Sequence, residues 1–177
     1  MITYIALLRG INVGGHKKMP MAELRELLKR EGLGKVMTYI QSGNVIFKSM
    51  ENEISLESKI EESIKAHFGF DVPVLVKSRE ELLEIFNACP FSRGIKEKCY
   101  FIVLNKTPER HLIDEVNKIS YENEQFIVKK NCLYFYSSLG FGKTKFNMST
   151  FERKLNVKGT SRNFNTMTKL LTLGAEI

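Results

Sequence analysis

The segment Arg9–Lys18 combines the residue types that bind anions. It reads Arg-Gly-Ile-Asn-Val-Gly-Gly-His-Lys-Lys and directly follows the apolar stretch Ile2–Leu8. Glycine permits positive φ angles and close approach of the backbone, and successive backbone N–H groups can form a concave anion site. We therefore expect this segment to contact a negatively charged ligand. The residues predicted to bind it are Arg9, Gly10, Asn12, Gly14, Gly15, Lys17 and Lys18.

A purely structural role for these glycines is the competing interpretation, because three glycines and an asparagine can turn a tight corner without any ligand. The segment is not a P-loop of the GxxxxGK[ST] type. His16 follows Gly15 where that motif has lysine, and neither serine nor threonine comes next to hold Mg²⁺. The segment also lacks GxGxxG and an acidic ribose partner about 20 residues later. ATP hydrolysis by a P-loop mechanism is therefore excluded.

A second polar motif, Gln41-Ser42-Gly43-Asn44, lies between two strand-like runs. A hairpin turn is its ordinary role. In a β-α-β-β-α-β unit, however, the first and third strands are antiparallel neighbours, so the start of the third lies near the end of the first. We therefore predict that Ser42 and Asn44 border the Arg9–Lys18 segment and offer hydrogen bonds to the same ligand.

Further cations lie near the C-terminus, at Lys143 and within Lys158–Thr166. Thr160 or Ser161 is expected to cap a final helix whose first turn carries Arg162, and a helix N-terminus attracts anions. A capped helix with a solvated basic face is the alternative. The C-terminal residues predicted to bind a ligand are Lys143, Arg162, Asn163 and Asn165. Whether they share one site with the N-terminal residues is left open.

The formal net charge of +7 is unevenly distributed along the 177 residues. Residues 1–50 carry a net +5 and residues 129–177 a net +7, whereas residues 51–128 carry −5. Basic ends of this kind bind anions strongly only if folding brings them together. The alternative is that the lysines keep the protein soluble.

Metal binding, a cofactor and a membrane span find no support in the sequence. The three cysteines are odd in number and show no CxxC spacing, and the histidines are dispersed, so neither a disulfide framework nor a zinc site is expected. No apolar run is long enough to cross a bilayer, and the N-terminus lacks the pattern of a signal peptide. We therefore expect a cytoplasmic protein that does not bind membranes.

The order of apolar patterns predicts an α+β fold. Residues 1–77 read as β-α-β-β-α-β, which is typical of a ferredoxin-like unit with an antiparallel sheet. Residues 78–177 repeat part of this order and form a second α+β half, which we expect to pack against the first. This half lacks a clear final strand, and two helical patterns near Ser149–Leu155 and Arg162–Leu173 close the chain.

Four motifs, taken together, resemble the domain-of-unknown-function 1697 family of small bacterial proteins over essentially the whole chain. They are Leu8–Gly15, Met21–Arg25, Tyr39–Val45 and Thr160–Thr166. The resemblance implies an α+β fold with a ferredoxin-like duplication, and it implies no activity. The chain departs from the family pattern at His16, which stands where lysine or arginine is usual, at Cys89, which replaces asparagine, and at Phe164, which replaces a frequent tryptophan.

Three functions are compatible with these observations. The first is binding of a phosphorylated or otherwise anionic ligand, such as a nucleotide, a sugar phosphate or a nucleic acid, at the glycine-rich basic segment. The second is an enzyme, a transferase or hydrolase acting on a phosphate-bearing small molecule, with His16 as the obvious proton-transfer group. The third is an assembly module that forms homo-oligomers through an exposed sheet edge. No catalytic residue is assigned, and whether the protein is an enzyme is left open.

Overall fold

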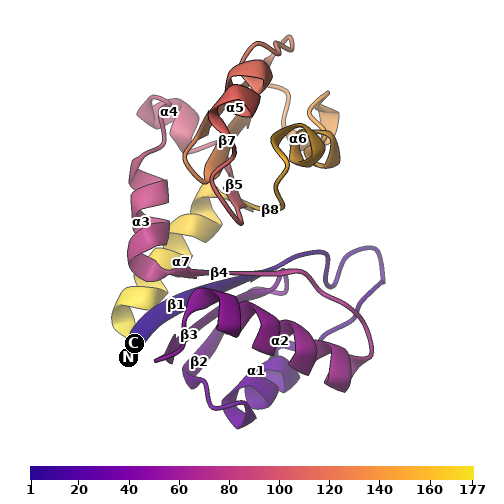
Figure 1. The fold of residues 1–177 in the computed structure, drawn as a ribbon, viewed down its shortest axis with the longest axis vertical. Helices are drawn as coiled ribbons and strands as arrows, with labels where there is room; N and C mark the ends of the chain where they lie inside the picture. The colour runs from indigo at the N-terminus through magenta and orange to yellow at the C-terminus, as the bar shows by residue number, and fades with distance from the viewer. The chain divides into compact units, whose positions relative to one another are not determined.

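The computed structural model describes residues 1–177, and its first half is a ferredoxin-like unit (Figure 1). Its elements are β1 (Ile2–Leu8), α1 (Met21–Arg30), β2 (Gly34–Tyr39), β3 (Asn44–Ser49), α2 (Glu53–Phe68) and β4 (Val74–Ser78). The strands form one sheet in the order β2-β3-β1-β4, and every neighbouring pair is antiparallel. The α+β class and the β-α-β-β-α-β order predicted from the sequence are thereby confirmed.

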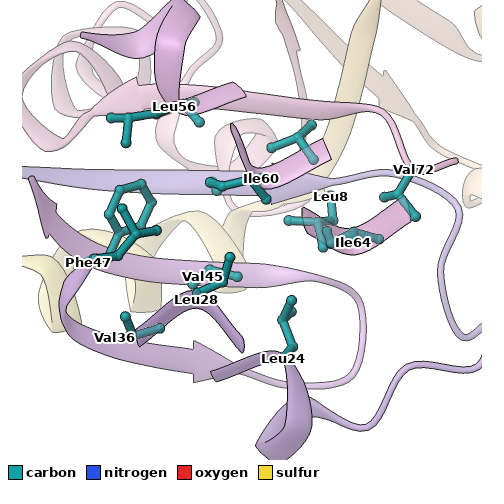
Figure 2. Close-up of a cluster of buried hydrophobic side chains, with 14 of the residues drawn as sticks. Leu8, Leu24, Leu28, Val36, Val45, Phe47, Leu56, Ile60, Ile64 and Val72 are labelled. Atoms are coloured by element: carbon teal, nitrogen blue, oxygen red, sulfur yellow. The ribbon is translucent and has the colours of Figure 1, made fainter. Parts of the chain in front are cut away.

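The core of this half lies between the sheet and the helices α1 and α2, which cover the same face (Figures 1 and 2). Alternate residues of the strands point into it, among them Leu8, Val45 and Phe47. Each helix contributes a buried stripe at helical spacing, and each such aliphatic side chain adds about 1.5–3 kcal/mol when removed from water. The buried helical residues are Met21, Leu24, Leu27 and Leu28 in α1 and Leu56, Ile60 and Ile64 in α2.

The second half repeats the same topology. After α3 (Arg79–Asn87) and α4 (Arg93–Lys96), its elements are β5 (Tyr100–Leu104), α5 (Arg110–Val116), β6 (Glu124–Lys129), β7 (Cys132–Ser137), a 3₁₀ turn η1 (Phe141–Lys143), α6 (Met148–Leu155), β8 (Gly159–Asn163) and α7 (Phe164–Glu176). The sheet order β6-β7-β5-β8 matches that of the first half strand for strand. An aromatic cluster that includes Phe135, Phe146 and Phe151 fills its core.

The strand β8 corrects two expectations from the sequence. The second half does have a final strand, because Gly159–Asn163 pairs antiparallel with β5. Neither Thr160 nor Ser161 caps the last helix, since both lie in β8. The cap is Asn163, whose side-chain oxygen accepts from the backbone N–H of Thr166 at 2.9 Å. Arg162 therefore lies in a strand and not in a helical turn.

Carboxylates of α2 cover the outer edge of strand β4. Glu53, Glu57 and Glu61 recur every four residues and so share one face of the helix. Each accepts a backbone N–H of β4 at 2.9 Å, from Ser78, Val76 and Val74 respectively. Exposed strand edges invite pairing with other chains, and this edge is closed by side chains instead.

The chain divides into two compact units, and the dividing points fall inside helices α3 and α7. One unit comprises Met1–Leu83 with Lys169–Ile177, and the other comprises Glu84–Thr168. The two units group residues differently from the sequence halves 1–77 and 78–177, which follow the repeated order of strands and helices.

Candidate functional site

The glycine-rich basic segment forms a short β-hairpin between β1 and α1, in the loop that extends past the end of the sheet in Figure 1. The backbone N–H of Asn12 donates to the Lys17 carbonyl at 3.2 Å, and that of His16 donates to the Val13 carbonyl at 3.0 Å. Gly14 and Gly15 at the tip have φ angles of 59° and 78°. Positive φ at both central residues defines a type I′ turn, so these two glycines serve the hairpin turn itself.

Asn12 anchors this hairpin to its surroundings. Its side-chain amide donates to the carbonyls of Met19 at 3.0 Å and Gln41 at 2.9 Å, and its side-chain oxygen accepts from the Met19 N–H at 2.8 Å. Its φ of 53° is one that asparagine tolerates better than most residues. Asn12 therefore ties the β1–α1 connection to the β2–β3 turn, and a contact between Asn12 and a ligand stays a prediction.

The β2–β3 turn packs directly against the base of the hairpin, which confirms the predicted neighbourhood of the two motifs. The Gly43 carbonyl accepts from the Leu8 N–H at 2.8 Å. A Cβ atom at Gly43 would lie 2.6 Å from the Leu8 Cβ and 3.0 Å from the Ile11 Cδ1. Only glycine fits this close approach of backbone to side chains.

Within the turn, Asn44 is fully buried and Ser42 is exposed. The Asn44 amide donates to the Tyr39 carbonyl and to the Ser42 Oγ, both at 3.0 Å. These bonds fix the turn, so Asn44 holds the exposed backbone in place. A direct contact of Ser42 or Asn44 with a ligand stays a prediction.

The basic side chains of the hairpin and its flanks have different surroundings. Lys17 donates from its Nζ to the Asp71 carbonyl at 2.5 Å, which fastens the hairpin to the segment that leads into β4. Lys18 and His16 are exposed and contact no carboxylate. Arg9 is half-buried, and its backbone N–H donates to the Pro73 carbonyl at 3.0 Å. Lys18 and His16 are therefore the basic side chains that this segment exposes to solvent.

The C-terminal candidates belong to the other unit. Arg162 is 8% exposed and donates to the Ser161 carbonyl at 2.8 Å, and burial lowers the pKa of its guanidinium to about 10. Asn163 caps α7, whereas Asn165 and Lys143 are exposed. These residues do not form the basic helical turn expected from the sequence. That they share a site with the hairpin stays a prediction.

A buried ion cluster in the first unit was missed at the sequence level. Lys77 of β4 is 8% exposed, and its Nζ lies 3.0 Å from Glu81 Oε1 and 3.2 Å from Glu53 Oε2. Burial alone would lower the pKa of Lys77, but the hydrogen bonds and charges of Glu81 and Glu53 outweigh it and raise that pKa. Burial raises the pKa of Glu81. The cluster links β4 to α2 and α3, which is a structural task.

The cysteines of the second unit are free thiols, and burial suppresses the reactivity of two of them. Burial is the main cause that raises the pKa of the Cys99 thiol, and the charge interaction with Cys89 raises it further. Burial is also the main cause that raises the pKa of Cys132. The thiolate is the reactive form, so these two side chains are poor nucleophiles.

No group of three or more histidine, cysteine, aspartate or glutamate side chains could hold a metal ion. None of the helices has both the length and the apolar character needed to cross a membrane.

The fold and the hairpin define the class of protein: a duplicated ferredoxin-like α+β protein with an inserted basic hairpin in its first repeat. The chain belongs to the family described as protein of unknown function (DUF1697), whose model matches residues 1–134. Among solved structures it is similar to the conserved bacterial protein SP0830 from Streptococcus pneumoniae, with 28% sequence identity, a TM-score of 0.78 and coverage of 98% of both chains. No curated protein matches the sequence.

Proposed function

We propose that the protein binds a phosphorylated or otherwise anionic ligand through the hairpin of residues 12–17 and the adjoining Lys18. The observation that carries the proposal is a difference between the two repeats. In the second repeat, residues 105–109 suffice to connect β5 to α5, whereas the first repeat uses residues 9–20 between β1 and α1. The hairpin is therefore not needed to complete the fold, and the added residues include exposed cations.

Two features of the hairpin suit a binding role. The Asn12 amide and Lys17 anchor it to its surroundings, and this anchoring reduces the ordering entropy that is lost when a ligand binds. Its exposed basic side chains, Lys18 and His16, have no carboxylate partner to displace. The half-buried Arg9 lies at the base of the same connection and adds to the positive potential.

The test is a binding titration with inorganic polyphosphate on the full chain, comparing the wild type with Lys18→Ala. Lys106→Ala is the matched control, because Lys106 is an exposed lysine in the equivalent short connection of the second repeat. We expect Lys18→Ala to weaken binding several-fold and to reduce the slope of log K against log salt, and Lys106→Ala to change neither. Equal effects of the two substitutions would contradict the proposal.

A further inference from the structure

We infer that the ligand of the hairpin is a single-stranded nucleic acid, whose phosphates contact Lys18 and whose bases contact the exposed side chains of Val13 and Ile40. This inference rests on the proposed function and names its ligand. Val13 is 67% exposed and Ile40 is 50% exposed, and both side chains are aliphatic. These two aliphatic side chains and the exposed, cationic side chain of Lys18 are here called the loop-end surface.

The two aliphatic side chains lie at the same end of the first sheet. Val13 follows Asn12 in the chain, and Ile40 precedes Gln41. The hydrogen bond from the Asn12 amide to the Gln41 carbonyl, at 2.9 Å, joins these two neighbours directly. The buried amide of Asn44 and the tight packing of Gly43 hold the turn that carries Ile40. The loop-end surface is therefore built from two connections that are fixed to each other.

Ile40 is retained in a backbone conformation that is unfavourable for it. Its φ is 50°, in the left-handed region, where the branched Cβ clashes with the backbone and where glycine or asparagine is usual. Because the side chain is half exposed, burial in the core does not offset this strain. Lys130, the first residue of the equivalent turn in the second repeat, has a φ of 52°, so the turn itself requires the left-handed conformation. What is particular to the first repeat is an exposed aliphatic side chain at this position, beside a basic hairpin.

The chemistry of the loop-end surface selects among anionic ligands. Inorganic phosphates and polyphosphates offer charge but no apolar surface for Val13 and Ile40. A duplex hides the faces of its bases by stacking, whereas a single strand exposes a base face beside each phosphate. Lys18 forms no ion pair with a carboxylate, and the Asp71 carboxylate is paired with Lys65 at 2.9 Å.

Fluorescence anisotropy with a labelled oligothymidylate tests the inference, with inorganic polyphosphate of matched charge and a duplex of the same length as competitors. The variants are Val13→Ser and Ile40→Gly, and Leu139→Ser is the control, since Leu139 is 57% exposed in the other unit. We expect the first two to weaken oligothymidylate binding about three- to tenfold while polyphosphate binding stays unchanged. Leu139→Ser should change neither.

A stability measurement separates loss of contact from loss of fold. Ile40→Gly relieves the left-handed strain, so the variant should melt at the same temperature as the wild type or a few degrees above it, although it binds the oligonucleotide less well. Equal weakening for both probes, no weakening for either, or preferential binding of the duplex overturns the nucleic-acid inference and leaves anion binding in place. If neither probe responds to Lys18→Ala, the proposed function itself fails.

Discussion

The two repeats share a backbone frame and differ in what is attached to one end of it. Leu8 donates its N–H to the Gly43 carbonyl, and Leu104 donates to the Asn131 carbonyl, each at 2.8 Å. The next residue of each repeat also makes an equivalent hydrogen bond. The Arg9 N–H donates to the Pro73 carbonyl at 3.0 Å, and the Asn105 N–H donates to the Lys158 carbonyl at 2.9 Å. The hydrogen bonds that close the strand ends are thus independent of the loops beyond them.

Both expanded loops lie at this end of the first repeat. The β1–α1 connection spans residues 9–20 against 105–109, and the β2–β3 turn spans residues 40–43 against 130–131. The two expansions contact each other through Asn12 and Gln41. The same arrangement of strands is thus closed by short loops in one repeat and by two mutually fixed long loops in the other, so it does not require the longer loops.

The last strands of the two repeats compare in a similar way. Lys77 pairs with Ile5 in β1 and Arg162 pairs with Phe101 in β5, so the two buried cations occupy equivalent positions. The strand edges are also treated alike, since the Glu61 carboxylate accepts from the Val74 N–H and the Glu152 carboxylate from the Gly159 N–H. The first repeat adds Glu53 and Glu57, which its longer helix α2 can supply.

The largest loss of stability is expected from Gly43→Ala, because the new methyl group would enter the tightly packed contact between the β2–β3 turn and the end of β1. The new Cβ would lie 2.6 Å from the Leu8 Cβ, and the backbone φ of 81° is unfavourable for alanine. Strain and overpacking together should lower the free energy of unfolding by about 3 kcal/mol. Urea denaturation measures this loss.

Gly15→Ala is the control for Gly43→Ala, because Gly15 has a similar φ of 78° with nothing within 4 Å of its Cβ. It should cost only the conformational part, about 1 kcal/mol. Equal losses of unfolding free energy for the two substitutions would contradict the claim that close packing at Gly43 distinguishes the first repeat. Asn131 shows that the second repeat accepts a side chain at the position equivalent to Gly43.

Lys77→Met should have the next largest effect, because it leaves the carboxylates of Glu53 and Glu81 without their shared cation. Removing one partner of a fully buried pair costs about 3–5 kcal/mol, and the partial exposure of both carboxylates reduces this to about 2 kcal/mol. Lys59→Met is the control, since the Lys59–Glu51 pair is more exposed and its loss should cost less than about 1 kcal/mol. If Lys77→Met lowers the free energy of unfolding no more than Lys59→Met does, the stabilising role assigned to the Lys77 cluster is wrong.

The same cluster predicts a pH dependence. The pKa of Lys77 is raised in the folded state above its ordinary value of 10.5, so the folded protein holds this proton more tightly than the unfolded chain. Its contribution to stability is therefore complete below pH 10.5 and is lost as the pH rises through the folded pKa. Urea titrations between about pH 9 and 12 should show a fall in stability that Lys77→Met diminishes.

Most of the fold could be predicted because it is encoded in local periodicity. The stripe of α1 and the alternating runs of β1 and β3 are visible in the sequence, and Gly69 ends α2 with a φ of 80° as a C-cap glycine should. Strand β8 was missed because Gly-Thr-Ser-Arg-Asn has no apolar alternation. It is a strand through its pairing with β5, and a Cβ at Gly159 would lie 2.8 Å from the Ile102 Cγ2.

The candidate site could be predicted only in outline. Topology alone placed Ser42 and Asn44 beside the glycine-rich segment, as antiparallel strands require. Sequence could not show that the Lys17 ammonium is fastened to a carbonyl while Lys18 is exposed, because the partner, Asp71, is distant in the chain. The spacing of Glu53, Glu57 and Glu61 was visible, but it equally fits a solvated helix face.

The smallest effect is expected at Ser161, and it has the opposite sign. Its Oγ is buried without a hydrogen-bond partner, whereas the equivalent position in β4 is Val76, which is fully buried in the apolar core. An unpaired buried hydroxyl costs free energy, so Ser161→Ala should raise the free energy of unfolding by about 1 kcal/mol. Ser161→Val would copy the first repeat and gain a similar amount if the core of the second repeat accommodates the extra volume. A decrease in stability for Ser161→Ala would show that the hydroxyl is paired in solution and that the two strands are less alike than their register indicates.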